Sequence, residues 1–137
     1  MQVSERMSTP AITITPETSH HTALRLMQDH GMHHLPVVDR QGQLVGVVAE
    51  RDLLLAVGHY LQNPIEVAEV MVRNVVTVAP DTLLTEAAGL MVRHKIGGLP
   101  VMNAEHQVVG VITETDIFRA FVAMVESGEG AALLRSN

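Results

Sequence analysis

A hydroxyl and a carboxylate stand three residues apart in Thr113-Glu114-Thr115-Asp116, directly after the apolar run Val108–Ile112. The run predicts a strand and the segment after it the first turn of a helix, so both side chains share one face of that turn. Free backbone N–H groups and the positive end of the helix dipole suit an anionic or polyhydroxylated ligand there. A carboxylate can accept two hydrogen bonds from the vicinal diol of a ribose. The alternative is a structural capping box, with Thr113 as N-cap and Asp116 at the third helical position.

The same junction occurs earlier in the chain, because residues 3–56 align with residues 67–120 without a gap at a shift of 64 residues. Of these 54 positions 20 are identical, which indicates a duplicated supersecondary unit. Asp52 is equivalent to Asp116, but Ala49 stands where Thr113 carries its hydroxyl. We therefore expect two equivalent clefts, of which the one in the second copy is the stronger site.

The composition excludes several classes of protein. The 137 residues are enough for one domain or a tight pair of half-domains, and 47% apolar with 18% charged residues excludes general disorder. The absence of cysteine excludes disulfides and thiolate metal sites, and fits a cytoplasmic location. A net charge of −6 and 2% aromatic residues argue against nucleic-acid binding. No membrane-spanning run or signal peptide is recognisable.

Each copy is expected to form β-α-β-β-α, which makes the whole chain α/β. In the first copy we expect a strand at Ala11–Thr15, a helix from Thr18 or Ser19 to Gly31, strands at His34–Val38 and Leu44–Ala49, and a helix from Glu50 to about Tyr60. In the second we expect a strand at Val75–Val78, a helix capped by Asp81 or Thr82 and ending near Gly97-Gly98, a hairpin, and a helix from Glu114 to about Glu126.

The domain organisation follows the duplication. Residues 1–60 form the first repeat, 61–66 a linker, 67–126 the second repeat and 127–137 a flexible tail. The last helix of each repeat lacks the polar stripe of a helix that faces water. Because one chain covers only one face of such a helix, we expect a homodimer that buries Leu54, Leu55, Phe118, Phe121 and Val122.

The motif Gly110-Val111-Ile112-Thr113-Glu114-Thr115-Asp116, preceded by Leu99-Pro100-Val101 and by Met91 near the end of a helix, resembles the CBS domain. Two such domains in tandem are called a Bateman module, and the resemblance covers residues 3–56 and 67–120. It implies two β-α-β-β-α units packed sheet to sheet with pseudo-twofold symmetry. It also implies that AMP, ADP, ATP or S-adenosylmethionine binds in the clefts as a regulatory ligand, with no cofactor required.

The resemblance further implies which residues contact the ligand. Thr113 and Asp116 hold the ribose hydroxyls in the second copy, as does Asp52 in the first. The basic side chains at the family's phosphate position are His33 and His34, whereas Gly97 and Gly98 let the backbone approach. Arg51 is additional to the motif and is placed where it could reach a phosphate. Adenine lies between aliphatic side chains and backbone, for which the candidates are Val76, Thr77, Leu99, Pro100 and Val101 in the second copy and Ile12, Thr13, Leu35, Pro36 and Val37 in the first.

Other kinds of site are disfavoured. The crowded histidines, His20, His21, His30, His33 and His34, are potential zinc or nickel ligands, but no pair has the H-E-x-x-H arrangement. The sequence contains no catalytic triad order, P-loop or cysteine nucleophile, so we expect no enzyme. The prediction is a cytoplasmic adenine-nucleotide sensor that regulates an unknown partner protein. The alternative is an interaction scaffold that keeps the fold without binding a ligand.

Overall fold

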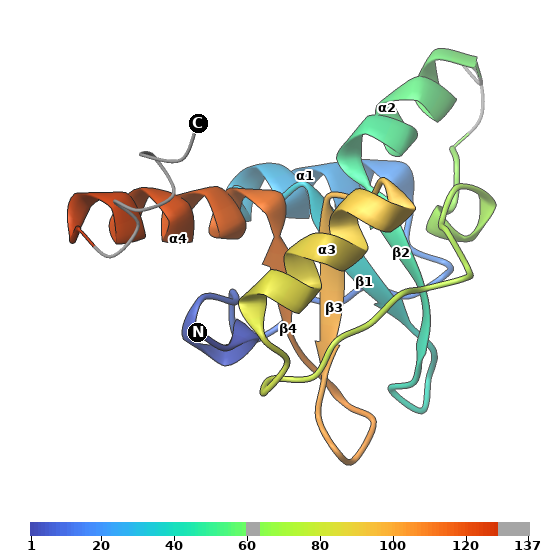
Figure 1. Ribbon diagram of the computed structural model, residues 1–137. Coiled ribbons are helices and arrows are strands. Elements are labelled where there is room, and N and C mark those ends of the chain that lie inside the picture. Colours follow the sequence, from blue (N-terminus) through green and yellow to red (C-terminus); the bar gives the residue numbers. More distant parts are fainter. Residues whose placement is uncertain (60–63, 129–137) are drawn as a thin grey trace.

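The helices and strands follow the two copies of the sequence in turn (Figure 1). The computed structural model describes residues 1–59 and 64–128, so Tyr60, much of the predicted linker and most of the predicted tail lie outside the described residues. The first copy contains η1 (Val3–Glu5), α1 (His20–His30), β1 (His34–Val38), β2 (Leu44–Ala49) and α2 (Glu50–His59). The second contains η2 (Val67–Glu69), α3 (Leu84–His94), β3 (Gly98–Met102), β4 (Val108–Thr113) and α4 (Glu114–Glu126).

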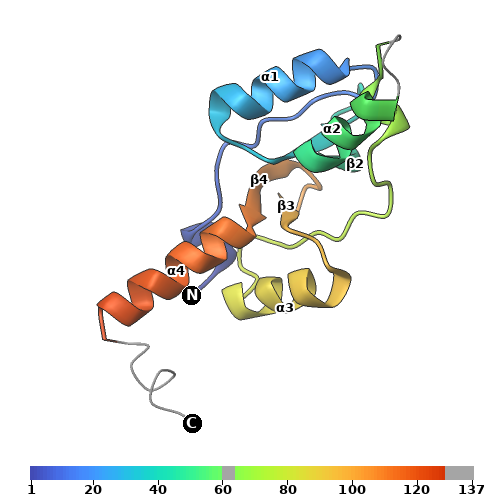
Figure 2. The ribbon, with the colours of Figure 1, turned by 90° about the horizontal axis from the view of Figure 1, so that it is seen from above.

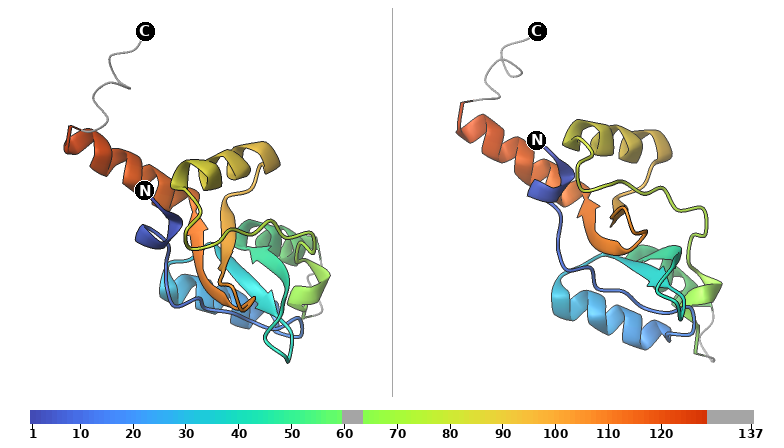
Figure 3. Two further views of the ribbon diagram at one scale, coloured as in Figure 1. Left: turned by 60° about the horizontal axis from the view of Figure 1, so that its bottom comes forward. Right: turned by 90° about the horizontal axis from the view of Figure 1, so that it is seen from below.

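Two antiparallel hairpins form the centre of the molecule, β1 with β2 and β3 with β4. Helix α1 covers the outer side of the first hairpin and α3 the outer side of the second (Figure 2). The layers therefore run from α1 through two facing hairpins to α3, while α4 extends away from them (Figure 3). This arrangement confirms the predicted α/β fold with two similar halves packed sheet to sheet.

The expected first strand of each copy is shorter than the sequence pattern suggested. Only Ile14 and Val78 pair, each in a single parallel bridge, with Val37 and Val101 respectively. The N–H of Ile14 donates to the carbonyl of Pro36 at 3.1 Å. A proline follows two residues after each bridge, and because proline has no N–H it cannot extend the pairing.

The ends of α1 agree with the sequence prediction, whereas those of α3 differ from it. Ser19 caps α1 by accepting the N–H of Thr22, and Gly31 ends it in the left-handed conformation. The expected caps of α3 are wrong, because Leu83 occupies the N-cap position without a side-chain hydrogen bond. Thr82 instead accepts the N–H of Ala79 at 2.9 Å, which closes the preceding turn. Lys95, and not the later glycine pair, takes the left-handed conformation that ends α3.

Each of the two hydrophobic cores contains a residue from the start of the other sequence copy. Val3 is fully buried in the core that contains Leu84, Leu99 and Ile112 of the second copy. The equivalent residue, Val67, is fully buried in the core of the first copy. Each copy therefore completes the core of the other, and neither copy encloses its own core.

The last helices divide their apolar residues between the interior and the surface. Leu53 of α2 and Ala120 of α4 are buried, but Leu54, Leu55, Phe118, Phe121 and Val122 are at least 44% exposed. The expectation that these helices carry apolar residues on a second face is thus met within the chain.

One histidine of the crowded group is a structural residue. His20 is buried at the start of α1, and its Nδ1 accepts the backbone N–H of buried Ile65 at 3.0 Å. The backbone N–H of His20 in turn donates to the carbonyl of Ile65 at 2.7 Å. This pair attaches the segment that follows α2 to the first half of the molecule.

We predict that His20→Ala lowers the free energy of unfolding by about 1–3 kcal/mol, because the buried N–H of Ile65 loses its acceptor. Urea unfolding at pH 7.5 measures the change. His20→Asn should recover part of the loss, since its side-chain oxygen can accept the same N–H. His30→Ala, at an exposed position, is the matched control, and an equal loss in this control would contradict the prediction.

Candidate functional site

Thr113 and Asp116 form the capping box that the sequence left as an alternative. The carboxylate Oδ2 of Asp116 accepts the N–H of Thr113 at 2.8 Å and its hydroxyl at 3.0 Å. The Thr113 oxygen accepts the N–H of Asp116 at 3.4 Å. Asp116 is 8% exposed, and its Oδ1 accepts no hydrogen bond from the described residues. The cap therefore uses one carboxylate oxygen and leaves the other outside the capping box.

At the equivalent junction in the first copy, the carboxylate makes fewer hydrogen bonds. Ala49 supplies no hydroxyl at the end of β2, so Asp52 cannot form the same box. Within residues 1–59 and 64–128 the Asp52 carboxylate has no hydrogen-bond or ion-pair partner and is partly exposed. Both junctions place a carboxylate in the first turn of a helix, but only that of Asp116 also has a structural role.

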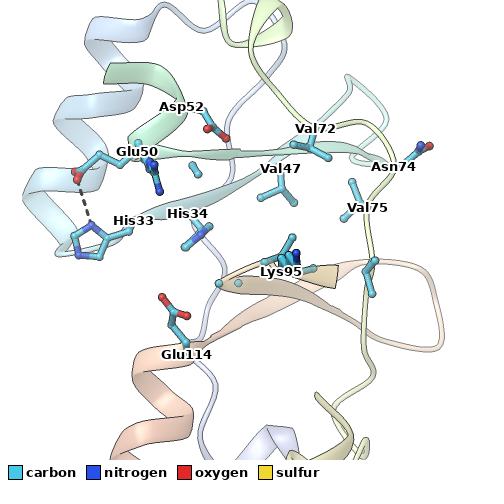
Figure 4. A pocket seen from close by; sticks show the side chains of 16 residues that line it. His33, His34, Val47, Glu50, Asp52, Val72, Asn74, Val75, Lys95 and Glu114 are labelled. Atoms are coloured by element: carbon cyan, nitrogen blue, oxygen red, sulfur yellow. Dashed lines mark hydrogen bonds and ion pairs between the residues drawn. The ribbon is translucent and has the colours of Figure 1, made fainter. Parts of the chain in front are cut away.

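A cleft of about 430 Å³ opens at the Asp52 junction and is called here the larger cleft. Figure 4 shows Asp52 and His34 on the side of the first copy and Glu114 on the side of the second. Its charged and polar lining is His33, His34, Glu50, Arg51, Asp52, Asn74, Lys95 and Glu114. Its apolar lining is Val47, Ala49, Val72, Val75, Val76, Ile96, Gly97 and Gly98.

A second cleft of about 280 Å³, called here the smaller cleft, opens at the Asp116 junction. Thr113, Glu114, Thr115, Asp116 and Arg119 line it from β4 and α4. From the first copy it is lined by Ser8, Gly31, Met32, His33 and His34, with Gly97 completing the wall. His33, His34, Gly97 and Glu114 thus belong to both clefts.

The structure corrects how the predicted residues are grouped. From the sequence, His33 and His34 are expected to lie with Asp52, and Val76 and Gly98 with Asp116. Instead, Val76 and Gly98 line the cleft of Asp52, and both histidines also line that of Asp116. The reason is the packing of the two halves about a pseudo-twofold axis, which sets each helix N-terminus against the loop before the hairpin of the other copy.

His34 and Gly98 occupy equivalent positions and meet between the two clefts. A Cβ added to Gly98 would lie 2.9 Å from Cγ of His34, so only glycine leaves room for the ring. Nδ1 of His34 is buried and has no hydrogen-bond partner among the described residues. Burial lowers the pKa of His34, which Glu114 raises, the neighbouring His33 lowers and Asp52 raises to lesser extents.

Several predicted adenine contacts lie elsewhere. Leu35, Pro36, Val37, Leu99, Pro100 and Val101 are buried inside the hairpins and line neither cleft. Thr13 and Thr77 are exposed, and Thr77 lies in a separate shallow depression with Asn103 and His106. The side chains of these residues therefore do not line the two clefts; Leu35, Val37, Leu99 and Val101 belong to the hydrophobic cores instead.

Several charged lining residues were missed by the sequence reading. Lys95 and Glu114 enter the larger cleft, and Arg119 enters the smaller one. Glu114 is identical to Glu50 across the repeat, which was a signal available in the sequence. Nδ1 of His33 lies 3.3 Å from Oε1 of Glu50, so this exposed histidine already has an acidic partner.

The described part of the chain contains neither a metal-binding cluster nor a membrane-spanning helix. No group of three or more histidine, aspartate or glutamate side chains there is placed to hold a metal ion. Nδ1 of His20, the first of the crowded histidines, already accepts the Ile65 N–H. None of the helices described is long and apolar enough to cross a bilayer.

The chain is similar to known proteins over most of its length. The family model described as "CBS domain" matches residues 3–59 and again residues 67–123. A CBS domain-containing protein of Dictyostelium discoideum is 32% identical in an alignment of 135 residues, which covers 90% of this chain and 93% of that protein. An L-aspartate semialdehyde sulfurtransferase of Methanocaldococcus jannaschii is 35% identical over 119 residues, 87% of this chain but only 23% of the enzyme. The chain thus corresponds to a minor part of that enzyme.

Solved structures share the arrangement of the two halves. The CBS domain pair of protein MJ0100, in complex with 5′-methylthioadenosine and S-adenosyl-L-methionine, has a TM-score of 0.82 and 34% identity, covering 90% of this chain and 97% of that one. CBSX2 of Arabidopsis thaliana in complex with AMP has a TM-score of 0.76 and 30% identity, also covering 90% and 97%. Relatives of the same architecture therefore hold adenosine-containing molecules.

We predict that Asp116→Ala lowers the free energy of unfolding by about 1–2 kcal/mol, because the cap of α4 loses its acceptor. Asp52→Ala is the matched control and should change it by less than about 0.5 kcal/mol. Urea unfolding of both variants without ligand measures the difference. Equal destabilisation would show that the capping box does not stabilise α4.

Proposed function

Because the chain belongs to the CBS-domain family as a tandem pair, we propose that it is a regulatory module that senses an adenosine-containing ligand. The observation that carries the proposal is the pair of clefts, each with a carboxylate in the first turn of a helix. Relatives at 34% and 30% identity that hold S-adenosylmethionine with methylthioadenosine, or AMP, support the same ligand class. The proposed ligand is AMP, ADP, ATP or S-adenosylmethionine.

In this proposal each part of the ligand meets a suitable group of the larger cleft. Asp52 accepts hydrogen bonds from the ribose hydroxyls, as an ionised carboxylate does with a diol. Val47, Val72, Val75 and Val76 supply the aliphatic surface for adenine. Arg51, Lys95 and the histidines supply positive charge or hydrogen bonds for phosphate.

The smaller cleft offers a different combination of ligand-binding groups. Asp116 has Oδ1 for the ribose, and the Thr113 hydroxyl lies beside it. Arg119 is the basic residue on α4 that enters this cleft. Because only this cleft keeps both the hydroxyl and the carboxylate, we retain it as the stronger ribose site.

The mechanism we propose is linkage between ligand binding and conformation. Each cleft lies between the two halves, so a bound ligand contacts both and favours the arrangement that fits it. A partner protein that prefers this arrangement then binds more tightly, and reciprocally raises the affinity for the ligand. In the alternative, an interaction scaffold, the capping box of Asp116 has only its structural role and neither cleft binds a nucleotide.

The exposed face of the last helices supports a homodimer. Phe118 and Phe121 of α4 are 66% and 44% exposed, and Leu54 and Leu55 of α2 are also exposed. We propose that a second copy covers this face, because closed twofold association is the commonest way in which one surface covers itself.

We predict that Asp116→Ala weakens binding of AMP or S-adenosylmethionine by about 1.5–3 kcal/mol, the range for a hydrogen bond to a charged group. Isothermal titration calorimetry at 25 °C measures it, after circular dichroism has shown that the variant is folded. Asp52→Ala is the comparison and should affect the weaker site. If Asp52→Ala abolishes binding and Asp116→Ala leaves it unchanged, the order of the sites is reversed. If the unsubstituted chain binds neither ligand, the scaffold alternative holds.

We predict that Phe121→Glu converts a dimer into a monomer or into insoluble protein, because it places a charge in the proposed apolar interface. Val92→Glu is the comparison variant, since Val92 is 79% exposed but lies on α3 and not on α2 or α4. Light scattering at micromolar concentration measures the mass. A monomeric unsubstituted protein would contradict the proposed dimer.

A further inference from the structure

The two clefts share their polar ends. All residues that line the smaller cleft, except Arg119, are equivalent at a shift of 64 positions to residues that line the larger cleft. Both sets include the first turn of a helix with its carboxylate, Asp116 in the smaller cleft and Asp52 in the larger one. Arg119 adds a cation to the smaller cleft. The smaller cleft therefore has groups suited to the hydroxyls and the phosphate of a ligand.

The aliphatic surface of the larger cleft has no counterpart in the smaller one. Figure 4 shows Val47, Val72 and Val75 together in the larger cleft, apart from His33 and Glu50. The four valines proposed to contact adenine, Val47, Val72, Val75 and Val76, are equivalent to Val111, Ser8, Ala11 and Ile12.

Of these four equivalent residues, only Ser8 lines the smaller cleft, and its side chain is polar. Val111 is 2% exposed, whereas Val47 is partly exposed in the larger cleft. Among the described residues that line the smaller cleft, Met32 has the one large apolar side chain. A base gains affinity by leaving water for apolar surface, and this surface is largely missing from the smaller cleft.

From this difference we infer that the two clefts recognise different parts of a nucleotide. The smaller cleft binds a phosphorylated ribose whatever base it carries, and the larger cleft selects a ligand that carries adenine. The inference rests on the proposed function, since it assigns the ligand class of the same two clefts. The chain can then hold an adenine nucleotide in the larger cleft and a sugar phosphate without a base in the smaller one.

Calorimetric titration with two ligands tests the inference. They are AMP and methyl β-ribofuranoside 5-phosphate, called here the riboside phosphate, which has a methoxy group in place of adenine. In the Asp52→Ala chain, where the smaller cleft is intact, we expect the two dissociation constants to agree within about threefold. In the Asp116→Ala chain, where the larger cleft is intact, we expect AMP to bind at least about tenfold more tightly, because only the base contacts the valines.

A competition experiment on the unsubstituted chain needs no folded variant. With the riboside phosphate in excess, an AMP titration should lose one of its two binding events. The affinity of the remaining event should change by less than about threefold, because the riboside phosphate binds the larger cleft poorly. This experiment decides the matter if Asp116→Ala, which removes a helix cap, fails to fold.

Exchange of residues between the repeats tests the role of the valines. Val72→Ser with Val75→Ala gives the larger cleft the residues that the first copy has at the equivalent positions. Both valines are at least partly exposed, so the fold should be retained. With the riboside phosphate in excess, this double variant should bind AMP at least about fivefold more weakly than the unsubstituted chain. Val92→Ser, on α3 and outside both clefts, is the matched control.

The outcomes separate the inference from the proposed function. If the Asp52→Ala chain prefers AMP by tenfold or more, or does not bind the riboside phosphate, the division between the clefts is wrong while nucleotide binding stands. The same holds if the excess riboside phosphate removes both AMP binding events or neither, or if the exchange of the valines leaves AMP affinity unchanged. If the unsubstituted chain binds neither ligand, the proposed function fails, and the division with it.

Discussion

The exchange of Val3 and Val67 between the two hydrophobic cores is the constraint on which the rest of the structure depends. Both residues are fully buried, each in the core of the other sequence copy. Exposing either would leave a core open to water, at a cost of the order of 1.5–3 kcal/mol for each side chain. The two halves therefore stay attached to each other through their cores, and the clefts lie between them.

That arrangement explains why each cleft is lined by residues of both copies. The first turns of α2 and α4 supply the carboxylates, while the loops that precede β3 and β1 supply the opposite walls. A ligand in either cleft would contact both halves. Binding is thus well placed to alter how the halves pack, which is what a sensor requires.

The two clefts differ because the copies have diverged at the residues where they meet. Thr113 corresponds to Ala49, Lys95 to Gly31 and Gly98 to His34. A side chain at position 98 would not fit beside His34, since a Cβ at Gly98 would collide with the ring of His34. Asp116 is committed to a helix cap as well as lining its cleft, whereas Asp52 only lines one. The two copies therefore have the same fold but different side chains in their clefts.

The sequence by itself determined the duplication, the hairpins, the ends of α1 and α4, and the family. These features depend on local chemistry and on periodicity, such as the cap at Ser19 and the Thr113–Asp116 spacing. Only the tertiary structure decided which residues share a cleft, because Val76 lines the cleft of Asp52 through the packing of the two halves and not by proximity in the chain. It also decided that Leu99 and Val101 are core residues, since an alternating strand does not show which face meets a ligand. The contact between His34 and Gly98 was also decided by the tertiary structure, because contact between residues 64 positions apart depends on how the two halves pack.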